Sequence, residues 1–306
     1  MSFSGMYNTQ GMLFLLMLLG LLLRRTSVIT REGEAFLTDL VLYVTLPASI
    51  LKSFQMEFTE ELLSSCLRVL LLTIILLAVS FLAGKLAFGF LPPEKRKIME
   101  YATMVSNAGI LGNPVAEGIF GDLGLMYASI YTIPLRIYMW SFGLMCFTKA
   151  PDKKRLLKKT CTHPCMLAAA LGLLLMSLPV SLPEVLDRTI RSAAGANTCL
   201  SMLLVGSILA SIPLKSMIDK KALYYSAIRL LFLPLAALLL CRAAGCDFVV
   251  TGVMVTLTGM PAGSTTAVLA QKYGCDAVLA TKCVVLSTML SMASVPAWCL
   301  IVSGLG

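Results

Sequence analysis

Residues Tyr101 to Gly121 read YATMVSNAGILGNPVAEGIFG, an apolar segment with Gly109, Gly112 and Pro114 near its centre. Proline removes a backbone donor and clashes with the preceding turn, and glycine weakens a helix further. In a bilayer, backbone groups freed in this way are tolerated only where they are buried in protein or line a cavity. The segment therefore predicts a membrane-spanning helix that is broken near its middle.

A second segment of this kind lies in the other half of the chain. It runs from Thr251 to Gly274 and reads TGVMVTLTGMPAGSTTAVLAQKYG, with Gly259, Pro261 and Gly263 at its centre. Matching interruptions in the two halves of a membrane chain indicate the binding site of a secondary transporter. Two kinks that serve only packing are the alternative.

The two segments also end alike. Phe120-Gly121 closes the first and Tyr273-Gly274 closes the second, and each pair is followed at once by another apolar run. Counted back from these aromatic residues, the break of the second segment is expected nearer to Thr265 and Thr266 than to Pro261.

The composition excludes whole classes of protein. Of the 306 residues, 58% are hydrophobic and only 13% are Asp, Glu, Lys or Arg, and the mean hydropathy is +0.87. A soluble domain carries about 25% charged residues. A disordered chain, a nucleic-acid binder and an ordinary soluble enzyme are therefore excluded, although the net charge is +9. An all-α polytopic membrane protein fits.

Apolar runs between charged or Pro/Gly-rich breaks predict ten transmembrane helices. A basic cytoplasmic loop, 148–163, separates a first half, 1–147, from a second half, 164–306. The spans are expected at about 6–23, 35–54, 67–91, 98–120, 124–147, 164–181, 193–213, 222–241, 248–270 and 275–303.

Most Lys and Arg residues lie in the odd-numbered loops, which are therefore predicted to be cytoplasmic, with both termini outside. Because each half has an odd number of spans, the halves are inserted upside down relative to each other. Two halves of five spans in opposite orientations indicate a 5+5 inverted repeat.

Four basic residues fall inside the predicted spans. Lys85, Arg229 and Lys282 lie near enough to the cytoplasmic ends to snorkel, whereas Arg136 lies near the bilayer centre. Arg136 is expected either to contact an anionic substrate or to serve a structural role, paired with Glu117 or with exposed carbonyls.

The breaks themselves favour an anion. The second half of a broken helix begins with unpaired N–H groups and the positive end of its dipole, which attract a carboxylate. Glu117 is a possible carrier of a coupling Na⁺ or H⁺, with an interfacial carboxylate as the alternative. No metal or other cofactor is expected. The candidate substrate-binding residues are Asn107, Gly112, Asn113, Pro114, Arg136, Pro261, Gly263, Ser264, Thr265 and Thr266.

At these residues the chain resembles a known family. The string NAGILGNPVAEGIFG, from Asn107, resembles an element of the auxin efflux carrier family, which includes bacterial permeases for malate and malonate and the plant PIN-type auxin exporters. The string GMPAGSTTAVLAQKYGCDAVLATKCVVLSTMLSMASVPAW, from Gly259, is similar to the C-terminal signature of that family, and Thr45-Leu46-Pro47 also matches. The short central loop resembles that of the permeases.

The resemblance implies a fold related to sodium/proton antiporters and bile-acid symporters. Spans 4 and 9 would cross at their breaks, spans 1, 2, 6 and 7 would form a scaffold that dimerises, and the remaining core would move as an elevator. Plant relatives carry a second Pro near the position of Thr266, where this chain has Thr.

The expected function is therefore a secondary transporter of small organic anions, mono- or dicarboxylates, in the cell membrane. The expected partners are the substrate, the lipid bilayer and a second copy of the chain, without nucleic acid. A membrane sensor that binds a ligand without moving it is the alternative. An intramembrane enzyme is disfavoured because the sequence contains neither HExxH nor GxSxG.

Overall fold

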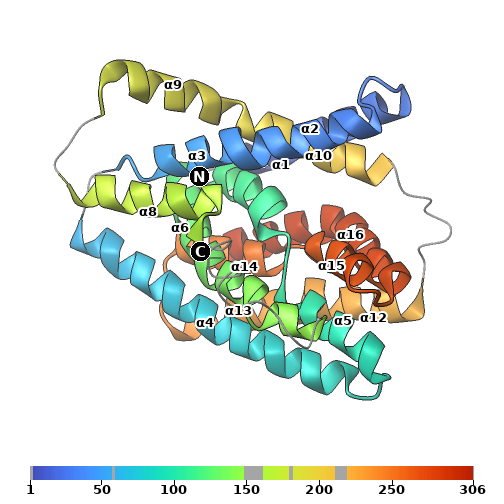
Figure 1. The fold of residues 1–306 in the computed structure, drawn as a ribbon. Helices are drawn as coiled ribbons and strands as arrows, with labels where there is room; N and C mark the ends of the chain where they lie inside the picture. The colour runs from blue at the N-terminus through green and yellow to red at the C-terminus, as the bar shows by residue number, and fades with distance from the viewer. Residues whose placement is uncertain (1–2, 57–58, 148–160, 179–181, 211–218, 306) are drawn as a thin grey trace. The chain divides into compact units, whose positions relative to one another are not determined.

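The computed structural model describes residues 3–56, 59–147, 161–178, 182–210 and 219–305 (Figure 1). Within these ranges every regular element is a helix, and no strand longer than a single isolated bridge occurs. The predicted all-α class is therefore confirmed.

The helices follow one another with short connections. The π-helical segments are η1, η2 and η4, and η3 is a 3₁₀-helix. The elements are α1 (Phe3–Arg25), α2 (Arg31–Leu40), η1 (Val41–Thr45), α3 (Leu46–Ser53), α4 (Glu60–Phe88), α5 (Pro93–Met104), η2 (Ala108–Gly112), α6 (Asn113–Trp140), η3 (Gly143–Cys146), α8 (Pro164–Ser177), α9 (Glu184–Gly195), α10 (Asn197–Ala210), α12 (Lys220–Ala227), η4 (Ile228–Phe232), α13 (Leu233–Ala243), α14 (Phe248–Thr258), α15 (Thr265–Lys272) and α16 (Ala277–Gly304).

The described helices suit a polytopic membrane protein. Five helical stretches are long and apolar enough to cross a bilayer, and α8 and α14 are shorter apolar helices. The five stretches are 31–53, 60–88, 184–210, 220–243 and 277–304. Each predicted span contains helical residues, while the count of ten crossings and the inverted repeat stay predictions.

Each π-helical segment ends two residues before a proline. Segments η1, η2 and η4 precede Pro47, Pro114 and Pro234, respectively. The proline ring clashes with the carbonyl four residues earlier. The wider π turn gives that carbonyl room, so the helix passes the proline without ending.

The aromatic–glycine pairs do end helices, as the sequence predicts. Gly121 has a φ of 69° and divides α6 in two, and Gly274 has a φ of 66° directly after the C-cap residue Tyr273 of α15. Both values lie in the left-handed region, which glycine adopts without a Cβ penalty.

The chain forms two compact units, and neither one is a sequence half. Unit 1 contains Met1–Leu67, Gly109–Ile130 and Thr162–Ile212, and unit 2 contains Arg68–Ala108, Tyr131–Cys161 and Pro213–Gly306. Unit 1 thus groups spans 1, 2, 6 and 7, for which the resemblance implies a scaffold, together with the first part of α6. The halves 1–147 and 164–306 remain a prediction about the repeat.

In unit 1, α1 packs closely along α10. Glycines make the contact possible, because a Cβ on Gly20 would lie 2.2 Å from the carbonyl oxygen of Leu203, and a Cβ on Gly206 would lie 1.9 Å from that of Met17. Small residues let membrane helices approach backbone to backbone.

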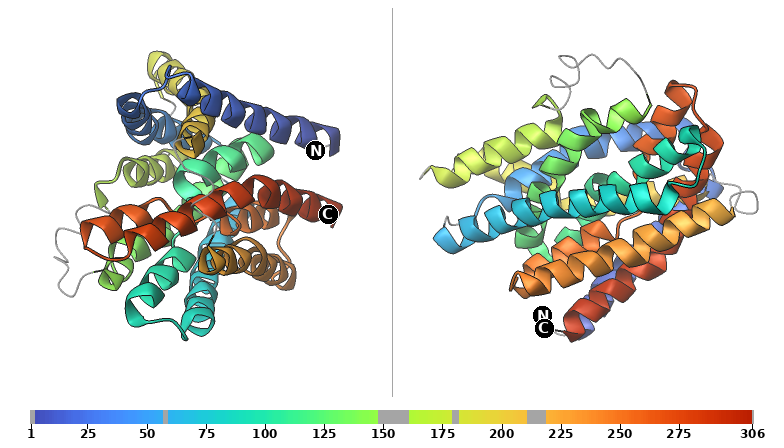
Figure 2. Two further views of the ribbon diagram at one scale, coloured as in Figure 1. Left: turned by 90° about the vertical axis from the view of Figure 1, so that its right-hand side faces the viewer. Right: turned by 90° about the horizontal axis from the view of Figure 1, so that it is seen from below.

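In unit 2, α16 packs along α12 and α14, and α13 packs on α14 (Figure 2). A buried cluster that includes Met99, Ala102, Tyr225, Ala262 and Cys283 joins α5 and α12 to the second break and to α16. The two interrupted segments are therefore held together by the core of this unit.

Candidate functional site

The first interruption lies earlier in the chain than the sequence suggests. Helix α5 ends at Met104, its C-cap residue Val105 is extended, and helical structure resumes at Ala108. The expectation that Gly109, Gly112 and Pro114 form the centre of the break is wrong. These residues lie in η2 and at the start of α6, where the wider π turn accommodates Pro114 without ending the helix.

The second interruption is centred on Pro261. Helix α14 ends at Thr258 and α15 begins at Thr265. The expected shift of the break toward Thr265 and Thr266 is therefore wrong. Threonine has a backbone N–H and can continue a helix, whereas Pro261 and its flanking glycines cannot do so readily.

The two breaks are hydrogen-bonded to each other within unit 2. Ser106 and Ala262 form an antiparallel bridge. The Asn107 N–H donates to the carbonyl of Pro261 at 2.8 Å, and the Gly263 N–H donates to the carbonyl of Val105 at 2.9 Å. This pairing satisfies backbone groups that the breaks free, as an apolar surrounding requires.

Three polar side chains of the two interrupted segments are buried without a partner. Among the described residues, the hydroxyls of Ser106 and Thr266 in unit 2 and both amide atoms of Asn113 in unit 1 have no hydrogen bond. Ser106 is 6% exposed, and the other two are fully buried. Such groups are rare and costly in native proteins, and they are suited to a polar ligand or to ordered water.

The other candidates differ in their surroundings. Thr265 accepts a hydrogen bond from the Tyr101 hydroxyl at 3.2 Å. Ser264 is exposed, Asn107 is half-buried, and Gly112, Pro114, Pro261 and Gly263 are buried.

Arg136 lies on α6 and is only 7% exposed. Within the part of the chain that the structure describes, no hydrogen bond or ion pair engages it. Its predicted pairing with Glu117 would join the two units and stays a prediction. A buried guanidinium without a protein anion is suited to bind a carboxylate from outside the chain.

Arg229 is a second buried arginine, for which the expectation of snorkelling is wrong. It is 2% exposed, its Nε donates to the carbonyl of Met260 at 2.8 Å, and its Nη1 donates to the carbonyl of Thr103 at 2.6 Å. Binding to exposed carbonyls was one of the alternatives predicted for Arg136. In the structure it is Arg229 that makes such contacts. The sequence carries no signal for this contact, because Arg229 lies far from both carbonyls along the chain.

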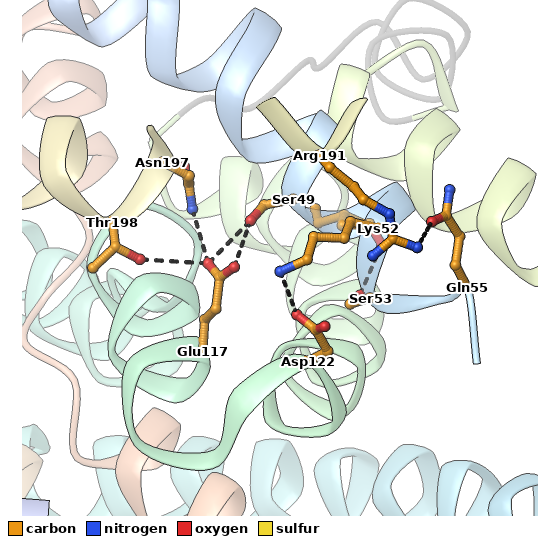
Figure 3. A network of polar contacts seen from close by, with 10 residues as sticks. Ser49, Lys52, Ser53, Gln55, Glu117, Asp122, Arg191, Asn197 and Thr198 are labelled. Atoms are coloured by element: carbon orange, nitrogen blue, oxygen red, sulfur yellow. Dashed lines mark hydrogen bonds and ion pairs between the residues drawn. The ribbon is translucent and has the colours of Figure 1, made fainter. Parts of the chain in front are cut away.

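Glu117 lies in a polar network of unit 1 (Figure 3). Ser49 donates to both carboxylate oxygens, at 2.8 and 3.0 Å, and Asn197 and Thr198 donate to Oε2 at 3.4 and 3.5 Å. Beside it, the ammonium of Lys52 is 2.9 Å from the carboxylate of Asp122. The network ties the first part of α6 to α3 and α10. Ser49 was not among the predicted residues, since a single serine in an apolar run carries no distinctive pattern.

Comparison with known proteins shows similarity to membrane transporters along nearly the whole chain. The model of the membrane transport protein family matches residues 11–299. An uncharacterized transporter of Methanothermobacter thermautotrophicus is 28% identical over 97% of this chain and 99% of its own length. The uncharacterized transporter YfdV of Escherichia coli is 24% identical over 94% of both chains. An uncharacterized transporter of Methanocaldococcus jannaschii is 22% identical over 93% of this chain and 94% of its own length.

Proposed function

Because this chain belongs to the membrane transport protein family, which is the family of the auxin efflux carriers, we propose that it is a secondary transporter of small organic anions. The substrate class is that of mono- and dicarboxylates such as malate or malonate. The observation that carries the proposal is the buried, unpartnered guanidinium of Arg136 in a chain whose paired breaks also bury unpartnered polar side chains.

The chemistry of the breaks supports an anion. The N-termini of η2 and α15 follow directly after the two breaks, and the start of a helix is the positive end of its dipole. Within unit 2, Ser106 and Thr266 would supply neutral hydrogen bonds, and Arg136 would supply the compensating charge. A carboxylate can accept two parallel hydrogen bonds from one guanidinium, which gives direction as well as affinity.

The proposed mechanism is elevator-type alternating access, in which the core that carries the breaks moves against the scaffold. The first part of α6 is held in unit 1 by the contacts from Glu117 to Ser49, Asn197 and Thr198. A movement of α6 with the core would have to break these contacts in every cycle. Glu117 is therefore our candidate for the residue that couples transport to H⁺ or another cation.

The proposed setting is the cell membrane, with both termini outside and two copies of the chain joined through scaffold helices. Cysteine accessibility at each terminus tests the orientation, and cross-linking between scaffold helices tests the dimer.

Binding and flux are best measured on the same purified protein. A thermal-shift screen of carboxylates, with and without Na⁺ and across pH, identifies ligands because a ligand that binds the native state raises the melting temperature. Uptake of the radiolabelled ligand into proteoliposomes then measures transport. We expect both signals for at least one carboxylate, and Arg136→Gln should abolish them while Arg242→Gln, an exposed arginine, should keep them.

The outcomes separate the alternatives. A shift without uptake would favour the sensor function over transport. Normal folding without a shift or uptake for any carboxylate would overturn the substrate class. A shift that persists in Arg136→Gln, Asn107→Ala and Pro114→Ala alike would place the substrate elsewhere in the protein.

A further inference from the structure

The first halves of the two interrupted helices end beside the same side chain. Thr103 lies in the last turn of α5, and Met260 lies just beyond the end of α14. The last carbonyls of a helix have no partner inside it, and they form the negative end of its dipole, equivalent to about half an elementary charge. Two such ends that meet in an apolar interior need a cation.

Arg229 supplies that cation. Its guanidinium donates to the carbonyls of Thr103 and Met260 at 2.6 and 2.8 Å. Both partners are carbonyl oxygens, and no carboxylate forms an ion pair with Arg229 among the described residues. One positive charge therefore faces two half-charges of opposite sign, and the balance is close to neutral.

Neighbouring contacts fix the helical segment that carries Arg229. Tyr225, one helical turn before Arg229, is buried and donates to the carbonyl of Ala102 at 2.8 Å. Trp298 of α16 donates its indole N–H to the carbonyl of Leu230 at 2.7 Å, within the π-helical segment that carries Arg229. The helical segment that carries Arg229 is thus held against α5 by Tyr225 and against α16 by Trp298.

In transporters with discontinuous helices, unwound carbonyls and the C-terminal ends of half-helices coordinate the coupling Na⁺. We propose that the carbonyls of Thr103 and Met260 form a cation site of this kind and that the Arg229 guanidinium is its permanent, built-in occupant. A small monovalent cation can then bind there only after the guanidinium is removed.

This inference stands on contacts within unit 2 and does not need a particular substrate. Its consequence for transport rests on the proposed function. Because Arg229 already bridges the two breaks, they need no Na⁺ to stay together, and a coupling ion would have to bind at another place in the protein.

The test compares cation effects on melting temperature in the wild type, Arg229→Ala and Arg229→Lys, without substrate. Low-millimolar guanidinium chloride and NaCl are each compared with choline chloride at equal ionic strength. Arg242→Ala is the matched control, because the Arg242 guanidinium also donates to a carbonyl, that of Leu305 at 3.0 Å, but is exposed.

We expect the wild type and Arg242→Ala to respond alike to each cation, and neither to respond to guanidinium. Arg229→Ala should melt several degrees lower and regain part of the loss with guanidinium or Na⁺, since either cation fills the emptied site. Arg229→Lys should lie between the two, because an ammonium lacks the planar fork that reaches two carbonyls.

An Arg229→Ala protein that responds to guanidinium and Na⁺ no more than the wild type does would overturn the proposal. Equal stability of Arg229→Ala and the wild type would overturn it as well. If Arg229→Ala does not fold, Arg229→Lys decides: a melting point equal to that of the wild type would contradict a site that needs the planar fork of the guanidinium.

Discussion

The backbone N–H of Asn107 donates to the carbonyl of Pro261 at 2.8 Å. This bond joins two interruptions that lie in different halves of the sequence. Together with the bond from Gly263 to Val105, it pairs the breaks in an antiparallel arrangement. The interruptions are therefore one structural feature, and disturbing either segment should affect both.

Gly263→Val should destabilise the protein by about 1–3 kcal/mol, because a side chain is forced into a filled space. Even a Cβ at this position would lie 3.2 Å from Cγ1 and 3.3 Å from the carbonyl oxygen of Val105. Chemical unfolding in detergent measures the change. Gly195→Ala is the control, since its Cβ would meet nothing within 4 Å, and equal effects of the two would contradict the close approach of the breaks.

Gly206→Ala should separate α1 from α10 and cost about 1–3 kcal/mol. Its Cβ would lie 1.9 Å from the carbonyl oxygen of Met17, and backbone atoms cannot move aside as a flexible side chain does. The melting temperature reports the loss. Gly11→Ala, with open space around its Cβ, should melt within a degree or so of the wild type; a Gly206→Ala protein as stable as this control would argue against the helix contact.

Ser49→Ala should cost about 1–3 kcal/mol, because it leaves both oxygens of the Glu117 carboxylate with fewer donors. Glu117→Gln combined with Ser49→Ala should lose less than the sum of the single changes, since the two side chains share one interaction. The free energy of unfolding of all four proteins gives the coupling. Additive effects would contradict the network, and Ser177→Ala, an exposed hydroxyl bonded within its own helix, should be neutral.

Arg136→Met should raise the melting temperature of the substrate-free protein, because an unpartnered buried charge is removed. The same change should weaken carboxylate binding more than about 30-fold, the equivalent of about 2 kcal/mol for a lost buried charge pair. Thermal shift without and with ligand measures both effects. A variant that is less stable than the wild type without ligand would show that Arg136 is a structural residue after all.

Asp219→Ala should cost about 1 kcal/mol at neutral pH, since Asp219 is the N-cap residue of α12. Partial burial opposes ionisation, but the N–H groups of Lys221 and Ala222 and the ammonium of Lys282 hold the pKa of Asp219 below its ordinary value of 3.8. In the acid range the unfolded chain therefore binds more protons at this residue, and stability rises with pH.

The Asp219 contribution is complete above the unfolded pKa and disappears as the pH falls through the lower folded pKa. Melting temperatures of the wild type and of Asp219→Ala should accordingly differ at pH 7 and converge in acid. A difference that stays constant down to acid pH would contradict this origin.

The sequence alone was sufficient for the class of the protein and for the existence of the breaks. Charged residues are too few for a soluble domain, and Gly and Pro inside apolar runs disturb a helix wherever it packs. The left-handed glycines Gly121 and Gly274 were predictable for the same local reason.

Tertiary structure decided where the breaks lie and which arginine serves which role. The first break falls on Val105 to Asn107, and these three residues pair with the second break. The glycines and the proline of the segment follow the break, because η2 accommodates Pro114 within the helix. Arg136 and Arg229 are both arginines inside apolar segments. Only the folded chain brings the carbonyls of Thr103 and Met260 to Arg229 and leaves Arg136 without a partner among the described residues. Contacts between residues that are far apart in sequence produce no periodicity or spacing in the sequence. They can therefore be identified only from the folded structure.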